Sequence, residues 1–131
     1  MARALGVFLA ILGTVAVVFG LVGVVTGGAG VIDHGDFSNE IDSEIRFFAA
    51  WYVAAGALIL RAARHPATET VTVRILFGAL FLAGCSRILS MIVVGRPHPF
   101  QIGLMVTELV LPVVVIPWQA AVARAHARAG E

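Results

Sequence analysis

Long apolar segments alternate with short polar segments along this chain. Each apolar segment is close to the length of about 20 residues that a helix needs to cross a bilayer. The four segments cover residues 4–26, 43–62, 72–94 and 100–122. The second one extends, with polar ends, over Asn39–Arg64. This pattern predicts an all-α, polytopic membrane protein, in which four transmembrane helices form one antiparallel bundle and a single domain over residues 1–131.

The composition is typical of a membrane protein. Hydrophobic residues make up 60% of the chain and charged residues 13%, against roughly 45–50% and about 25% in a soluble domain. The net charge of +1 and the lack of lysine argue against a nucleic-acid partner. Cys85 is the single cysteine, which excludes an internal disulfide. The first apolar segment is longer than the core of a signal peptide, so we expect it to be retained as a spanning helix.

The distribution of arginine predicts how the helices are oriented. Six arginines lie at one set of helix ends and two at the other, where the acidic residues of the first loop also gather. The larger group is Arg3, Arg61, Arg64, Arg74, Arg124 and Arg128, and the smaller group is Arg46 and Arg96. Cytoplasmic loops carry an excess of basic residues, so both termini are predicted to be cytoplasmic.

Glycines recur every seven residues in the first apolar segment, at Gly6, Gly13, Gly20 and Gly27. A step of seven keeps them on one helix face, where small residues let the backbone of a second helix approach closely. The second helix can belong to the same chain or to another copy of it. The stripe therefore predicts either packing within the chain or a homo-oligomer interface.

One charged residue, Arg87, lies well inside the third apolar segment. Glu108 lies inside the fourth, and the turn between the two segments is short. Counting residues from that turn puts both about 12 Å below the outer surface. An arginine at that depth costs at least about 2.5 kcal/mol on insertion scales, so it needs a partner or a wet cavity. Arg87 and Glu108 are therefore predicted to form a buried ion pair, with Gln101 and Pro112 on the same face as Glu108.

Residues at the start of the second segment extend this candidate site. Arg46 follows Asp42 by four residues, a spacing at which the two can pair on the helix surface. Glu44 shares a face with Trp51 and has two interpretations. It caps a pocket with aromatic walls, or it lies in water at the membrane interface, where tryptophan is also common.

The first loop contains metal-ligating residue types without a metal-binding pattern. These residues are Asp33, His34, Asp36, Glu40 and Asp42. Their spacing matches neither an EF-hand nor a zinc site. Motifs of serine hydrolases, phosphate-binding loops and metalloproteases are also missing from the sequence. We therefore expect no metal and no cofactor.

Three stretches carry a resemblance to a known family. They are "EIRFFAAWYVAAGALIL", "RILFGALFLAGCSRILSMIVVGRPHPF" and "TELVLP", and they resemble the bacterial membrane family catalogued as domain of unknown function 4345. The shared pattern is Glu44-x-Arg46, Gly56, Arg87, Gly95-x-Pro97 and Glu108. The resemblance implies a four-helix protein of the bacterial plasma (inner) membrane with no settled activity. A more distant similarity to DoxX-type proteins implies a link to quinone-dependent oxidoreductases, although this chain has no redox motif.

Three classes of function fit these observations. The first is an accessory or structural subunit of a larger membrane assembly, in which the Arg87–Glu108 pair fixes helix register. The second is a protein that binds or transports a lipid, quinone or other amphiphile at a polar site open to the outer leaflet. The third, an enzyme with Glu108 as acid or base, lacks a second catalytic group. We favour the first, with membrane lipid and a protein partner or second copy as its contacts.

Overall fold

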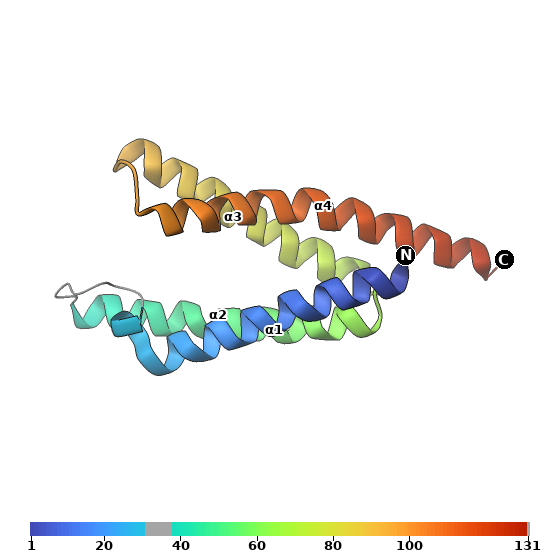
Figure 1. Ribbon diagram of the computed structural model, residues 1–131, viewed down its shortest axis with the longest axis horizontal. Coiled ribbons are helices and arrows are strands. Elements are labelled where there is room, and N and C mark those ends of the chain that lie inside the picture. The colour runs from blue at the N-terminus through green and yellow to red at the C-terminus, as the bar shows by residue number, and fades with distance from the viewer. Residues whose placement is uncertain (31–37, 131) are drawn as a thin grey trace. The chain divides into compact units, whose positions relative to one another are not determined.

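The computed structural model describes residues 1–30 and 38–130, and they are almost entirely helical (Figure 1). The elements are α1 (Ala2–Thr26), the short 3-10 helix η1 (Gly27–Gly30), α2 (Asn39–Arg64), α3 (Thr70–Val93) and α4 (Pro99–Ala129). All four α-helices are long and apolar enough to cross a membrane. The predicted all-α class and its four potential membrane spans are therefore confirmed. The fourth helix is longer than predicted, because it continues past residue 122 to Ala129.

The chain divides into two compact units. Residues 3–65 contain α1, η1 and α2, and the residues from Pro66 onward contain α3 and α4. Each unit is an antiparallel pair of helices, or helix hairpin. The predicted assembly of both hairpins into one bundle stays a prediction.

Glycine allows the close packing of α1 on α2. A Cβ added at Gly13 would lie 3.0 Å from the carbonyl oxygen of Gly56, and one added at Gly20 would lie 2.7 Å from that of Ala49. Because the higher-numbered glycine faces the lower-numbered partner, the two helices run antiparallel. Gly23 also faces Ala49. The glycine stripe thus packs within the chain at these positions, and the homo-oligomer interface stays a prediction.

The two ends of the stripe differ from its middle. Gly6 lies in α1 and is half-buried. Gly27 lies just beyond the last residue of α1, with a φ of 56°, the left-handed conformation in which glycine commonly ends a helix. A Cβ on Gly27 would also collide with the carboxylate of Asp42. Gly27 therefore ends α1 beside α2 instead of packing from within the helix.

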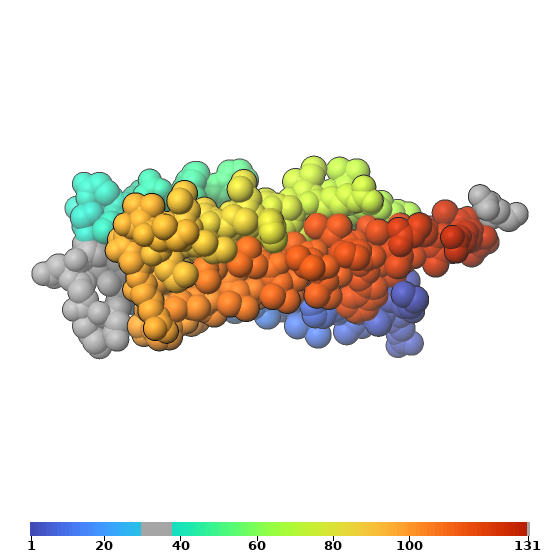
Figure 2. Space-filling view, turned by 90° about the horizontal axis from the view of Figure 1, so that it is seen from above, coloured from blue at the N-terminus to red at the C-terminus, as the bar shows by residue number. Residues whose placement is uncertain are grey.

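The second hairpin packs along one face of α4. The buried residues of this face recur at steps of three or four, as expected for one helix face. They are Glu108, Pro112, Val115, Gln119 and Val122. On α3, a Cβ added at Gly84 would lie 2.9 Å from the side chain of Leu109. Figure 2 shows α3 and α4 side by side, with the red end of α4 extending beyond α3.

The turn between α3 and α4 is built from residues with restricted or unusual backbones. Gly95 has a φ of 119°, which side chains other than glycine rarely tolerate. Pro99 occupies the first turn of α4, where its missing N–H is not needed. The Nδ1 atom of His98 accepts a hydrogen bond from the N–H of Phe100 at 3.3 Å. These features end α3 and restart the chain as α4 within five residues.

Candidate functional site

The side chains of Arg87 and Glu108 form an ion pair between α3 and α4. Nε of Arg87 donates to Oε2 of Glu108 at 2.7 Å. Arg87 lies six residues before the end of α3 and Glu108 nine residues after the start of α4, so their Cα atoms are about 9 and 13 Å from the helix ends. The sequence-predicted contact is therefore present, although the distances of the two Cα atoms from their helix ends differ by about 4 Å.

Gln101 completes this cluster. Nη1 of Arg87 donates to Oε1 of Gln101 at 2.7 Å. Gln101 lies two residues into α4, and Glu108 lies seven residues further on the same face, which separates the two by about 10 Å along the axis. The Arg87 guanidinium contacts both side chains, so it lies between these two positions along α4.

The two charged members of the pair differ in exposure. The Glu108 side chain is 6% exposed, whereas that of Arg87 is 34% exposed. A buried carboxylate is tolerated only when it is paired and hydrogen-bonded, and Arg87 supplies this for Glu108. Pro112 lies on the same face and is buried. Because proline has no N–H, the carbonyl of Glu108 lacks its usual partner within the helix.

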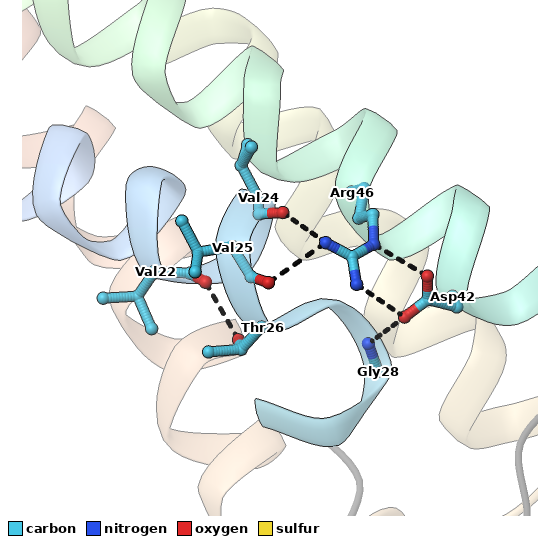
Figure 3. Close-up of polar contacts among 7 residues, drawn as sticks. All are labelled: Val22, Val24, Val25, Thr26, Gly28, Asp42 and Arg46. Carbon is cyan, nitrogen blue, oxygen red and sulfur yellow. Dashed lines mark hydrogen bonds and ion pairs between the residues drawn. The ribbon is translucent and has the colours of Figure 1, made fainter.

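A second charged cluster closes the turn end of the first hairpin (Figure 3). Nε of Arg46 donates to Oδ2 of Asp42 at 2.7 Å. Nη1 of Arg46 donates to the carbonyl oxygens of Val24 and Val25 at 2.6 and 3.1 Å. Oδ1 of Asp42 in turn accepts from the N–H of Gly28 at 2.8 Å. Both side chains come from the start of α2, and their backbone partners come from the end of α1 and from η1.

This cluster caps α1. The last carbonyls of a helix have no partner within it and carry the negative end of the helix dipole, so a guanidinium placed there is favourable. The sequence predicted the pair of Arg46 with Asp42, and that pair is present. It gave no signal for the contacts with the carbonyls of Val24 and Val25, which depend on how closely α1 approaches α2.

The other predicted members of the site on α2 are exposed. Glu44 is exposed, and Trp51 is 63% exposed. The Trp51 ring meets that of Phe47 edge to face, with ring centroids 6.3 Å apart. Glu44 and Trp51 belong to the first hairpin and Arg87 to the second. A shared site for these three residues stays a prediction.

Sequence reasoning missed Gln119, which is fully buried on α4. Its Nε2 donates to Oγ1 of Thr70 at 2.8 Å and to the carbonyl of Pro66 at 3.3 Å. These contacts join α4 to the start of α3 at the end opposite the turn. Gln119 follows Glu108 by eleven residues, which is three helix turns on the same face. Continuing the stripe of Gln101 and Glu108 in this way would have found it.

The structure describes only some of the metal-ligating residue types of the first loop. Asp33, His34 and Asp36 lie outside the described residues. Within residues 1–30 and 38–130, no three His, Cys, Asp or Glu side chains gather closely enough to hold a metal ion. The absence of a metal and of a cofactor stays a prediction.

Comparison with known proteins gives one match. The model of the family described as domain of unknown function (DUF4345) matches residues 4–119, a range that includes α2, α3, most of α1 and α4, and both charged clusters. No curated protein and no solved structure matches the chain. The similarity to DoxX-type proteins therefore stays a prediction.

Proposed function

This chain belongs to the family described as domain of unknown function (DUF4345), and we propose that it is a small multi-pass membrane protein acting as a non-enzymatic accessory subunit of a larger assembly. The observation that carries this proposal is the Arg87–Glu108 pair, whose two charges belong to one hairpin and are 2.7 Å apart. Such a pair fixes the register of α3 on α4. The two charges therefore already pair with each other within the chain, before any partner subunit is bound.

The same geometry weighs against an enzyme. A general acid or base must come within hydrogen-bond reach of its substrate. The Glu108 side chain is only 6% exposed, and its Oε2 already accepts from Arg87. These facts support a structural role for Glu108 over a catalytic one.

The end of α4 supports contact with another molecule. Gln119 bonds to Thr70, the first residue of α3, and Val122 is the last buried residue of α4, so residues 123–129 extend past the packed face. The side chains of Arg124, His126 and Arg128 in this extension are exposed. A basic helical extension of this kind fits an acidic surface of a partner subunit.

Native mass spectrometry of protein released directly from membrane vesicles tests the accessory role. We expect the 13.8 kDa chain to appear in a particle that contains at least one other polypeptide. Exchange of Arg124 and Arg128 for glutamine should release that polypeptide, because the extension loses both arginine charges. The same exchange at Arg3 and Arg74, which are also exposed, removes two charges elsewhere and is the matched control. Detection of the chain solely as a monomer with bound lipid would contradict the proposal, and a particle of identical chains would replace it with homo-oligomerisation.

We further propose that both termini are cytoplasmic and that the membrane is the bacterial plasma membrane. The six-to-two distribution of arginines supports this orientation. Reporter fusions after Thr68, His98 and Gly130 should give cytoplasmic, external and cytoplasmic signals, respectively. An external signal from the fusion after Gly130 would reverse the assigned orientation.

A second candidate function is the binding of an amphiphile at Arg87. It is favoured by the difference in exposure within the ion pair, since the guanidinium side chain is 34% exposed and the carboxylate side chain 6%. A molecule that approaches this pair from outside would meet the cation first.

A further inference from the structure

The Arg87 guanidinium is bonded to a residue near the turn end of the hairpin. Its hydrogen bond to Gln101 reaches the first turn of α4, whereas its Cα lies about 9 Å from the end of α3. In a hairpin that crosses the bilayer, the turn end is the surface end. The guanidinium is therefore held between the first and third turns of α4, in the outer part of a hairpin that crosses the bilayer.

The orientation of Gln101 adds a second donor. Arginine can only donate hydrogen bonds, so the amide oxygen of Gln101 must face Arg87 and its NH₂ group must face away. Gln101 is half-buried. An acceptor that reaches Arg87 from the turn end can thus also receive an N–H from Gln101.

Charge at the turn end favours an anion. Arg96 lies in the turn itself and is exposed. Within residues 70–130, Glu108 is the one acidic residue, and the acidic residues predicted on the same side of the membrane belong to the first loop and the first hairpin. Two arginines against one buried carboxylate leave a net charge of +1. Each basic residue near a membrane surface strengthens the attraction of anionic lipid.

The surface around Arg87 suits a lipid. Ala83 and Ser90, one turn to either side of Arg87, are both exposed, and their small side chains leave room beside the guanidinium. Leu80, two helix turns before Arg87 on the same face, is half-buried, and it offers apolar contact to an acyl chain. A charged headgroup site and an apolar path thus lie on the same helix.

We propose that the turn end of the α3–α4 hairpin binds one anionic phospholipid, with its phosphate held by Arg87 and Gln101 and its net negative charge attracted by Arg96. Guanidinium suits this task because its planar donors match phosphate oxygens. This inference rests on the second candidate function, amphiphile binding at Arg87. It is independent of the accessory role, which is read from the polypeptide composition of the particle.

The test is native mass spectrometry of protein reconstituted in nanodiscs of equal parts phosphatidylcholine and phosphatidylglycerol. We expect the wild type to retain one phosphatidylglycerol preferentially. Arg96→Gln should lower that retention about fivefold, the effect of one basic residue at a membrane surface. Arg87→Leu with Glu108→Leu removes the site without changing the net charge, and we expect it to abolish the preference.

Three results would overturn the proposal. Arg128→Gln removes the same charge as Arg96→Gln but at the opposite end of the hairpin, so an equal loss in both would indicate attraction by net charge alone. Equal retention in the wild type and the double leucine variant would reject Arg87 as a ligand. Displacement of the lipid by millimolar inorganic phosphate would assign the site to a free anion. Because Arg96 is exposed in the turn, its variant remains informative if the double variant does not fold.

Discussion

Replacing Arg87 and Glu108 together by leucine is expected to restore most of the stability that either single replacement removes. Replacing Arg87 leaves the Glu108 carboxylate buried without its cation, which typically costs about 3–5 kcal/mol. Replacing Glu108 should cost less, because the Arg87 side chain is 34% exposed and keeps its hydrogen bond to Gln101. Removing both leaves no charge, and packed apolar side chains often replace a buried ion pair without loss. The measurement is the free energy of unfolding in lipid or detergent for the wild type, both single variants and the double variant.

The control for this cycle combines Glu108→Leu with Arg96→Leu. Arg96 is an exposed turn residue and does not contact the Glu108 carboxylate among the described interactions. Its replacement should therefore leave the loss caused by Glu108→Leu unchanged. Additive losses for Arg87→Leu and Glu108→Leu would show that the two side chains do not share an environment in the membrane.

Gly20→Ala is expected to destabilise the first hairpin by about 1–3 kcal/mol, the usual cost of inserting a methyl group into a packed core. The added Cβ would lie 2.7 Å from both the carbonyl oxygen of Ala49 and the backbone nitrogen of Val53. Backbone atoms cannot rotate away, so α1 and α2 must separate. Thermal unfolding of the purified variant in detergent measures the loss.

Gly78→Ala and Gly103→Ala are the matched controls. A Cβ at either position meets nothing within 4 Å, so stability should be unchanged or slightly higher, since alanine is the better helix former. If Gly20→Ala behaved like these two variants, α1 would not pack on α2 at Gly20. Equal losses in all three would point to a general intolerance of α-helical substitutions and not to this interface.

The sequence predicted the helices better than their ends. Hydropathy located all four helices because it reports the apolar part of each one. It ended the fourth segment at residue 122, although α4 continues to Ala129. The alternating alanines and charged residues of 123–129 have good helix propensity, but they no longer read as a membrane span. At this end of the chain, the helix therefore continues beyond the segment that is apolar enough to span a membrane.

A contact between charged residues could be predicted from the sequence where a short turn brings the two helices together. The turn between α3 and α4 is short, so depth and helix face were enough to bring Arg87 to Glu108. Nothing comparable was available for Arg46, whose contacts with the carbonyls of Val24 and Val25 require the end of α1 to lie against α2. Those contacts lie beside Gly27, whose left-handed backbone just beyond α1 the seven-residue glycine repeat did not predict.

The placement of the two charge pairs has a consequence for membrane insertion. Arg46 and Asp42 lie four residues apart on one helix, so both partners of this ion pair are present as soon as α2 has been synthesised. Arg87 and Glu108 lie 21 residues apart on two helices, so α3 alone would carry an unmatched guanidinium past the translocon gate. The transfer of α3 into lipid costs less once Glu108 has been synthesised and can pair with Arg87. We therefore expect α3 to remain at the translocon until α4 arrives and the two helices to partition into lipid together.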